Sequence, residues 1–94
     1  MSVKFLVHRE SDSVGVAVVD IAPNTDADGR YRDQAGDLKI LVTEPVLLGH
    51  KFAIRPIVNG EDVIEYGVTI GSATKDIAVG QSVHVHNLKG KRWA

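Results

Sequence analysis

The sequence predicts an all-β protein of short strands joined by tight glycine turns. Its 94 residues include fourteen Val and seven Ile against eight Ala and six Leu, and branched side chains favour the pleated surface of a sheet over a helix. Glycines also recur at short intervals between apolar residues, which leaves little room for helices of ordinary length. The length corresponds to one domain over residues 1–94.

The first elements expected are two apolar strands, at residues 3–8 and 14–21, which a polar turn joins into a hairpin. Residues 23–37 are rich in Asp and Gly and hold hardly an apolar side chain. They predict a surface excursion around a turn, and the least ordered part of the chain. Residues 38–43 predict a further strand, which Pro45 ends because proline donates no hydrogen bond to a ladder.

A weak repeat fills the second half of the chain. It reads Val46-x-x-Gly49-x-x-Phe52, Ile57-x-x-Gly60-x-x-Val63 and Ile77-x-x-Gly80-x-x-Val83. Because glycine adopts a positive φ at no steric cost, each repeat can reverse the chain while both apolar flanks return to one core. We therefore expect three tight turns between short strands.

Composition excludes several classes of function. Eleven Lys plus Arg against twelve Asp plus Glu give no overall attraction to nucleic acid or anionic lipid. No apolar stretch approaches the ~20 residues that span a bilayer, and no signal peptide is evident, so we expect a cytoplasmic protein without membrane contact. The absence of cysteine excludes disulfides, thiolate metal sites and a cysteine nucleophile. Nucleotide-binding, serine-hydrolase and zinc-protease motifs are also missing, which argues against catalysis by this chain alone.

Two histidines stand in a stretch that is typical of a strand. His84 and His86 alternate with Val83 and Val85, and a period of two would put both imidazoles on one face with Cα atoms roughly 6.5 to 7 Å apart. The pair could ligate a metal ion or contact an anionic substrate. The alternative is that the valines face the core and the histidines face solvent or a partner subunit.

Other polar residues are further candidates. His50 and Lys51 follow Gly49 directly, so a turn could present an imidazole and an ammonium to a carboxylate or sulfonate, or simply be solvated. His8 ends the first strand and has the same two interpretations. Tyr66 precedes Gly67, and its hydroxyl could donate to a substrate or satisfy a buried backbone carbonyl.

Several segments together resemble the SAF domain of the altronate and galactarate dehydratase family. They are residues 48–54, 63–67, 70–73 and 83–87, preceded by His8 and then Asp12, Ser13 and Val14. Ser13 departs from the family, which usually has Asn there. The resemblance covers nearly the whole chain and implies a compact β-clip fold, in a small subunit that works with a large (beta) catalytic subunit.

The resemblance also implies a reaction. Members of the family eliminate a group from a small anionic 2-hydroxy acid, and the family suggests Fe²⁺, held mainly by the large subunit. Residues 2–9, 12–16 and 91–93 are similar to the carbon–sulfur lyases of the family, in which sulfite leaves. The small subunit of a sugar-acid dehydratase, and a non-catalytic capping or binding subunit, stay open as alternatives.

Site roles follow from the same resemblance. We expect His50 and Lys51 to face the substrate anion, with Tyr66 as a third catalytic residue that orients its turn. The residues expected to bind substrate are His8, Asp12 and Ser13. The residues expected at the metal site or the subunit junction are His84 and His86.

Overall fold

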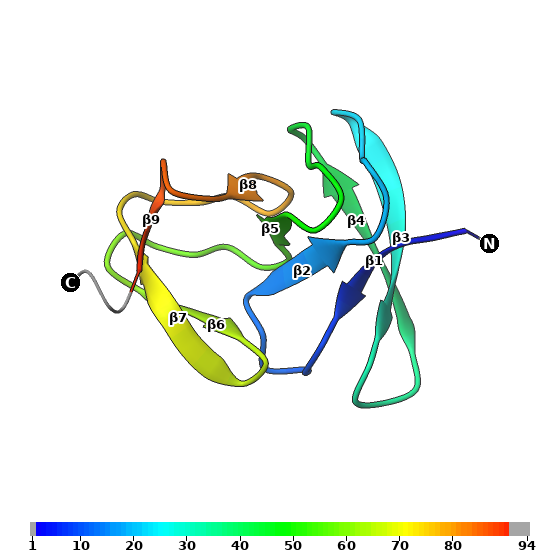
Figure 1. The fold of residues 1–94 in the computed structure, drawn as a ribbon, viewed down its shortest axis with the longest axis horizontal. Helices are drawn as coiled ribbons and strands as arrows, with labels where there is room; N and C mark the ends of the chain where they lie inside the picture. The colour runs from blue at the N-terminus through cyan, green and yellow to red at the C-terminus, as the bar shows by residue number, and fades with distance from the viewer. Residues whose placement is uncertain (1, 91–94) are drawn as a thin grey trace.

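The computed structural model describes residues 2–90, which form strands, turns and loops; the sequence similarity noted at residues 91–93 lies outside this range. Within it there is no helix, and so none long and apolar enough to cross a membrane. The all-β prediction is confirmed. The strands, labelled in Figure 1, are β1 Val3–Val7, β2 Val14–Ala17, β3 Thr25–Tyr31, β4 Asp37–Val42, β5 Lys51–Ala53, β6 Asp62–Glu65, β7 Val68–Ala73, β8 Ser82–Val83 and β9 Leu88–Gly90.

The strands form two sheets. The larger has the order β4-β3-β1-β2-β5-β8, and the smaller has the order β6-β7-β9. Among the strands of residues 2–90, only β1 and β3 pair in parallel; β1 and β2 form the predicted antiparallel hairpin. Figure 1 shows the smaller sheet at one end of the molecule, β1, β3 and β4 at the other, and β2 and β5 between them.

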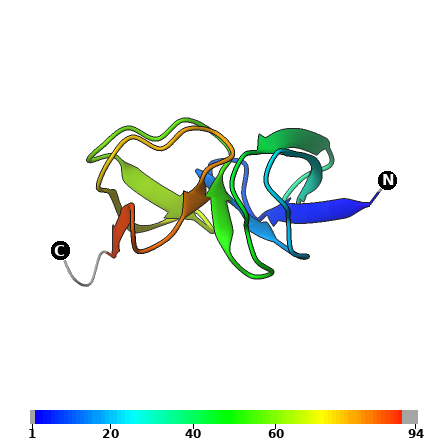
Figure 2. The same ribbon diagram turned by 90° about the horizontal axis from the view of Figure 1, so that it is seen from above.

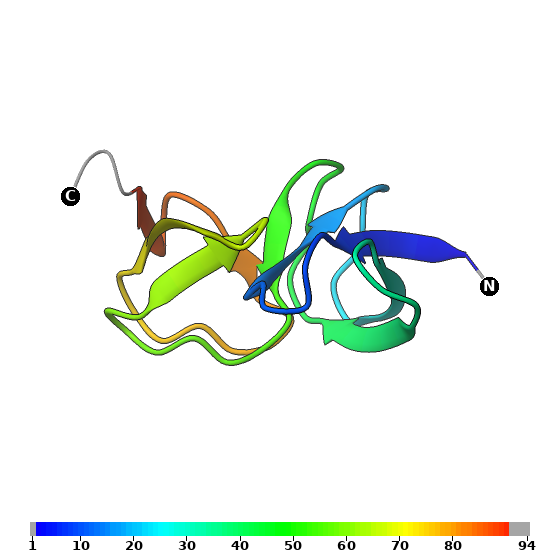
Figure 3. The same cartoon turned by 90° about the horizontal axis from the view of Figure 1, so that it is seen from below.

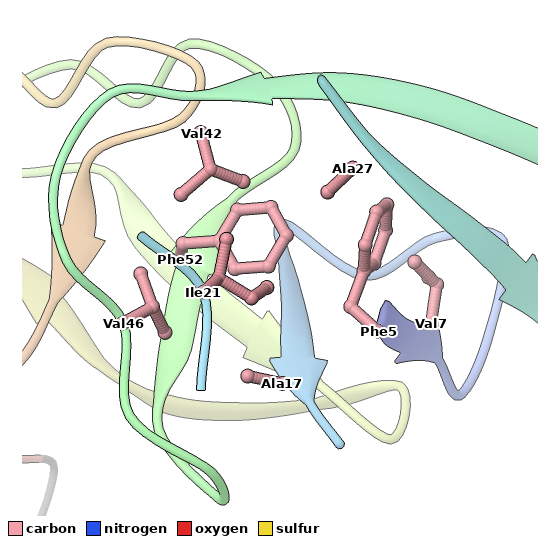
Figure 4. Packing of buried hydrophobic residues seen from close by; sticks show 8 residues of the cluster. All are labelled: Phe5, Val7, Ala17, Ile21, Ala27, Val42, Val46 and Phe52. Atoms are coloured by element: carbon pink, nitrogen blue, oxygen red, sulfur yellow. The ribbon is translucent and has the colours of Figure 1, made fainter. Parts of the chain in front are cut away.

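Each end has its own apolar core. In the first, the rings of Phe5 and Phe52 meet edge to face with centroids 4.8 Å apart, and Figure 4 shows smaller aliphatic residues packed around them. Burying each ring contributes about 1.5 to 3 kcal/mol. The second core lies between the sheets and consists of Val14, Ala53, Ile57, Val63, Ala73, Ile77 and Val83.

The prediction for residues 23–37 is wrong. Strand β3 occupies Thr25–Tyr31 and pairs with both β1 and β4. Its buried positions are Ala27 and Gly29, and a Cβ at Gly29 would overlap the ring of Phe5. The strand lacks an apolar pattern because a neighbouring strand's aromatic ring fills the space that its own side chains would occupy.

The strand predicted at residues 14–21 ends earlier, at Ala17. Residues 17–21 then run against residues 46–49 in an arrangement that we call the first clip. The Gly49 N–H donates to the Ala17 carbonyl (2.8 Å), and Ile21 and Val46 exchange two backbone hydrogen bonds (2.8 and 3.0 Å). The Asp20 carboxylate accepts from the Leu48 N–H at 2.8 Å. Figures 2 and 3 show both segments projecting from the same side of the molecule.

The second clip repeats these contacts with residues 73–77 against residues 57–60. The Gly60 N–H donates to the Ala73 carbonyl (2.8 Å), Ile57 and Ile77 exchange two bonds (2.9 and 2.7 Å), and the Asp76 carboxylate accepts from the Asn59 N–H (2.8 Å). The glycine repeat was predicted from the sequence, but its Ala-x-x-x-Ile partner, and with it the equivalence of the clips, was not.

A third clip pairs residues 53–57 with residues 77–80 and shares the Ile57–Ile77 bridge with the second. Gly49, Gly60 and Gly80 have φ values of +85°, +88° and +87°, a region that glycine enters without the steric cost of a Cβ. The three predicted glycine turns are confirmed.

Candidate functional site

The strand predicted across residues 83–86 is wrong, because β8 ends at Val83. The chain then turns, and the buried Asn87 closes the turn. Its side-chain oxygen accepts from the His84 N–H (2.9 Å) and its amide donates to the Ser82 carbonyl (2.7 Å). An asparagine amide that offers both bonds competes with a strand ladder. His84 and His86 therefore do not share one face of a strand.

His84 instead lies against His50. The two imidazole rings stack with centroids 5.2 Å apart and an interplanar angle of 24°. The sheet register explains the meeting: Lys51 of β5 is paired with Val83 of antiparallel β8, so the residues one step beyond that pair fall opposite each other. The structure thus brings together two of the predicted histidines from distant parts of the sequence, while His86 is exposed on the turn.

His50 differs in type from the residues at the equivalent position of the glycine repeat. The equivalent residues in the other two repeats are Glu61 and Gln81, whose side-chain oxygens accept from the N–H groups of Val58 (2.9 Å) and Ala78 (2.8 Å) within their own turns. An imidazole replaces that turn-stabilising group at His50 and stacks on His84. The side chain of His50 therefore does not form the turn-stabilising hydrogen bond that Glu61 and Gln81 form.

Lys51 forms an ion pair that joins the two sheets. Its Nζ lies 3.8 Å from Oε1 of Glu65 on β6, and the two side chains are 31% and 14% exposed. Glu65 was not predicted from the sequence, since a single acidic residue in a strand carries no motif. Its pairing with Lys51 depends on how the two sheets pack.

Lys51 and His84 also line a hollow of about 520 Å³, together with Lys89 and the apolar side chains of Val83, Val85 and Leu88. Pockets that hold small ligands have this size and this mixture of apolar walls with a few charged groups. Two ammonium groups and an imidazole at its rim favour an anionic ligand.

Tyr66 and His8 make a second group. Their rings stack with centroids 3.7 Å apart and an angle of 11°. Tyr66 has a φ of +56° and Gly67 a φ of +71°, so they form the two-residue turn between β6 and β7. A side chain at positive φ costs about 1 to 2 kcal/mol. Tyr66 is 56% exposed, so its ring presents itself at the surface instead of covering a buried carbonyl.

Asp12 and Ser13 hold this turn in place. The Asp12 carboxylate is inaccessible and accepts from the backbone N–H groups of Arg9 (3.2 Å), Tyr66 (3.0 Å) and Gly67 (2.9 Å). The Ser13 hydroxyl accepts from the Ile64 N–H at 3.1 Å. These bonds offset the strain at Tyr66, which identifies both residues as supports of the His8–Tyr66 stack. Their direct contact with a substrate stays a prediction.

The two groups are connected through the chain, because Glu65 and Tyr66 are consecutive. Among residues 2–90, no three His, Asp or Glu side chains are arranged to hold a metal ion. The His50–His84 pair could supply two imidazole ligands at most, and a complete metal site would need donors from elsewhere.

The fold and this cationic hollow define a class of protein. A family model described as the altronate/galactarate dehydratase SAF domain matches residues 3–91, and the chain belongs to this family. It is 43% identical over 94 residues to (2R)-sulfolactate sulfo-lyase subunit alpha of Chromohalobacter salexigens, covering 99% of this chain and 100% of that one.

Two further relatives place the chain within the family. Subunit alpha of the (2R)-sulfolactate sulfo-lyase of Paracoccus pantotrophus is 39% identical over 57 residues, which are 61% of this chain and 85% of the relative. Altronate dehydratase of Escherichia coli is 38% identical over 78 residues, which are 83% of this chain but 14% of that enzyme. The domain thus occurs both as a subunit and as a small part of a long chain.

Proposed function

We propose that this chain is the small subunit of a (2R)-sulfolactate sulfo-lyase, which eliminates sulfite from (2R)-3-sulfolactate and leaves pyruvate. The observation that carries the proposal is the 43% identity along the whole of a relative with that name. Because both such relatives are called subunit alpha, a large catalytic subunit is part of the proposal.

The reaction is a β-elimination. A base removes the proton at C2, the electrons of that C–H bond form the C2=C3 bond, and the C3–S bond breaks with its electrons leaving on sulfite. The resulting enol takes up a proton at C3 and loses the proton of its C2 hydroxyl, which gives pyruvate. Iron, held mainly by the large subunit in this proposal, would supply a Lewis acid for the carboxylate and hydroxyl of the substrate.

The small subunit contributes charge and orientation. Sulfolactate carries a carboxylate and a sulfonate, and the hollow beside the stacked histidines offers the ammonium groups of Lys51 and Lys89. Glu65 fixes the Lys51 ammonium at one side of the hollow, so the positive charge is already positioned when an anion arrives. His50, whose side chain accepts no bond from its own turn, supplies an imidazole donor or acceptor next to His84, which lines the hollow.

The direct test is reconstitution. The chain is combined with its large subunit and supplied with (2R)-3-sulfolactate, and sulfite and pyruvate are measured in parallel. Equal amounts of both products are expected, with none from either chain alone. A complex that releases no sulfite contradicts the proposal.

A sugar-acid dehydratase subunit is the second candidate, which the 38% identity to altronate dehydratase favours. Hydroxide would then leave in place of sulfite. The same complex supplied with altronate or galactarate distinguishes the two, since a 2-oxo acid formed from a sugar acid, with sulfolactate untouched, identifies the dehydratase.

A further inference from the structure

The end of the first clip is aliphatic and exposed. Four side chains, which we call the aliphatic tip, are 37%, 40%, 56% and 63% exposed: Val18, Val19, Leu47 and Leu48. They lie together because the bonds between Ala17 and Gly49 and between Ile21 and Val46 close a small ring of chain around them. Both segments project from one side of the molecule (Figures 2 and 3).

The second clip shows that its backbone does not require such residues. It forms the same hydrogen bonds between equivalent atoms. At the positions of the aliphatic tip it carries Thr74, Lys75, Val58 and Asn59, all of them exposed. A clip of this geometry therefore forms with a mixed, largely polar surface, and its backbone does not require four exposed aliphatic side chains. A group of exposed aliphatic side chains at one end of a molecule is typical of a surface that another molecule covers.

The position of the tip identifies what covers it. Leu47 and Leu48 lead through Gly49 directly into His50 and Lys51, so whatever covers the tip also borders the candidate site. In altronate dehydratase the matched domain is 14% of a much longer chain, so there it is joined to a far larger protein body. The Asp20 carboxylate beside the tip accepts a hydrogen bond from the Leu48 N–H, which fixes its position but leaves its negative charge at the edge of the tip.

We propose that the aliphatic tip inserts into an apolar groove of the large catalytic subunit and so seats His50 at an active site shared by both chains. This inference rests on the proposed function, which supplies the large subunit. A second copy of this chain is the competing occupant.

The second clip provides the design of the test. In one variant the tip receives the residues of the second clip, as V18T, V19K, L47V and L48N together. Because an equivalent backbone already carries these residues, the variant is expected to fold, and its thermal unfolding is compared with that of the unchanged chain. The matched control is Val58→Asn, since Val58 is equivalent to Leu47 and is 59% against 56% exposed. Binding to the purified large subunit is measured by titration calorimetry.

The exchanged tip is expected to raise the Kd for the large subunit at least tenfold, while Val58→Asn changes it less than twofold. At a saturating concentration of small subunit, sulfite release per complex should recover. Equal binding of the unchanged and exchanged chains overturns the docking proposal but leaves the proposed function standing. Failure of the unchanged chain to bind the large subunit overturns both. Light scattering tests for a homodimer of the small subunit. If the exchanged tip converts a homodimer to monomers and leaves the Kd for the large subunit unchanged, the occupant is a second copy, and the proposal is overturned.

Discussion

The first and second clips have the same backbone and different surfaces. In each, a glycine N–H reaches an alanine carbonyl, two branched residues form a bridge, and an aspartate holds the turn. The residue that ends the turn is His50 in one and Glu61 in the other. Both backbone N–H groups donate back into their turns, but of the two side chains only that of Glu61 accepts a hydrogen bond from its own turn. In the first clip, the equivalent side chain stacks on His84 instead. The difference separates what the fold needs from what a partner or substrate needs.

The largest loss of stability is expected where a clip glycine has a positive φ and also lacks space for a Cβ. Gly80→Ala places a Cβ on the Leu41 carbonyl, whereas Gly60→Ala meets nothing within 4 Å at almost the same φ. The first should cost roughly 2 to 5 kcal/mol, from backbone strain plus overlap, and the second about 1 to 2 kcal/mol from strain alone. Chemical denaturation of both variants measures the difference; equal losses would show that strain dominates at Gly80 as well.

Exchanging the residues that end the turns should separate activity from stability. His50→Glu, like His50→Ala, is expected to lower turnover of the reconstituted complex at least tenfold, or about 1.4 kcal/mol of transition-state stabilisation. Glu61→His should leave turnover within twofold while the lost bond to the Val58 N–H costs about 0.5 to 1.5 kcal/mol of stability. Steady-state kinetics and thermal unfolding are measured for both. Unchanged kinetics in the His50 variants would remove His50 from the site and favour a capping subunit.

The two aspartates that hold the turns should be energetically equivalent in the isolated chain. Asp20→Ala and Asp76→Ala each remove one hydrogen bond from a backbone N–H to the carboxylate, with an N–O distance of 2.8 Å in both cases. We expect each to cost about 0.5 to 1.5 kcal/mol, with the two values agreeing within about 0.5 kcal/mol, in urea unfolding. A much larger loss at one of them would mean that the clips are not alike in energy although they are alike in geometry.

The residue that follows the turn is Lys51 in the first clip and Asp62 in the second. The smallest effect is expected when the ion-pair partner of Lys51, Glu65, is changed. Glu65→Gln removes the carboxylate that positions Lys51. Because the pair is partly exposed, stability should fall by less than about 1 kcal/mol, and KM should rise roughly two- to fivefold with kcat little changed.

The control for Glu65 is Asp37→Asn, which breaks the exposed Arg30–Asp37 pair (Nε–Oδ1 3.2 Å) away from the site and should leave KM unaltered. A fall in kcat with constant KM in Glu65→Gln would assign Glu65 a part in the chemical step instead of in anion binding.

The extent of sequence-based prediction differs between turns and strands. The turns at Gly49, Gly60 and Gly80 were predictable because a positive φ is a property of a single residue and its neighbours. Strand β3 was not, since its inward face is formed by Ala27, Gly29 and the ring of Phe5 from another strand. The strand expected at His84 does not form, because the Asn87 side chain, three residues later, accepts from the His84 N–H that a strand ladder would use.

The candidate site divides along the same line. His50, Lys51 and Tyr66 were recognisable from the sequence as residues beside glycine turns, and His84 from its alternation with valines; all four also lie in segments that resemble a family. The tertiary structure alone decided that His84 meets His50 and not His86, that Glu65 holds Lys51, and that Asp12 supports Tyr66 from within. The physical reason is range: local backbone preferences are written in a few adjacent residues, whereas these contacts depend on the register and packing of strands that lie far apart in the chain.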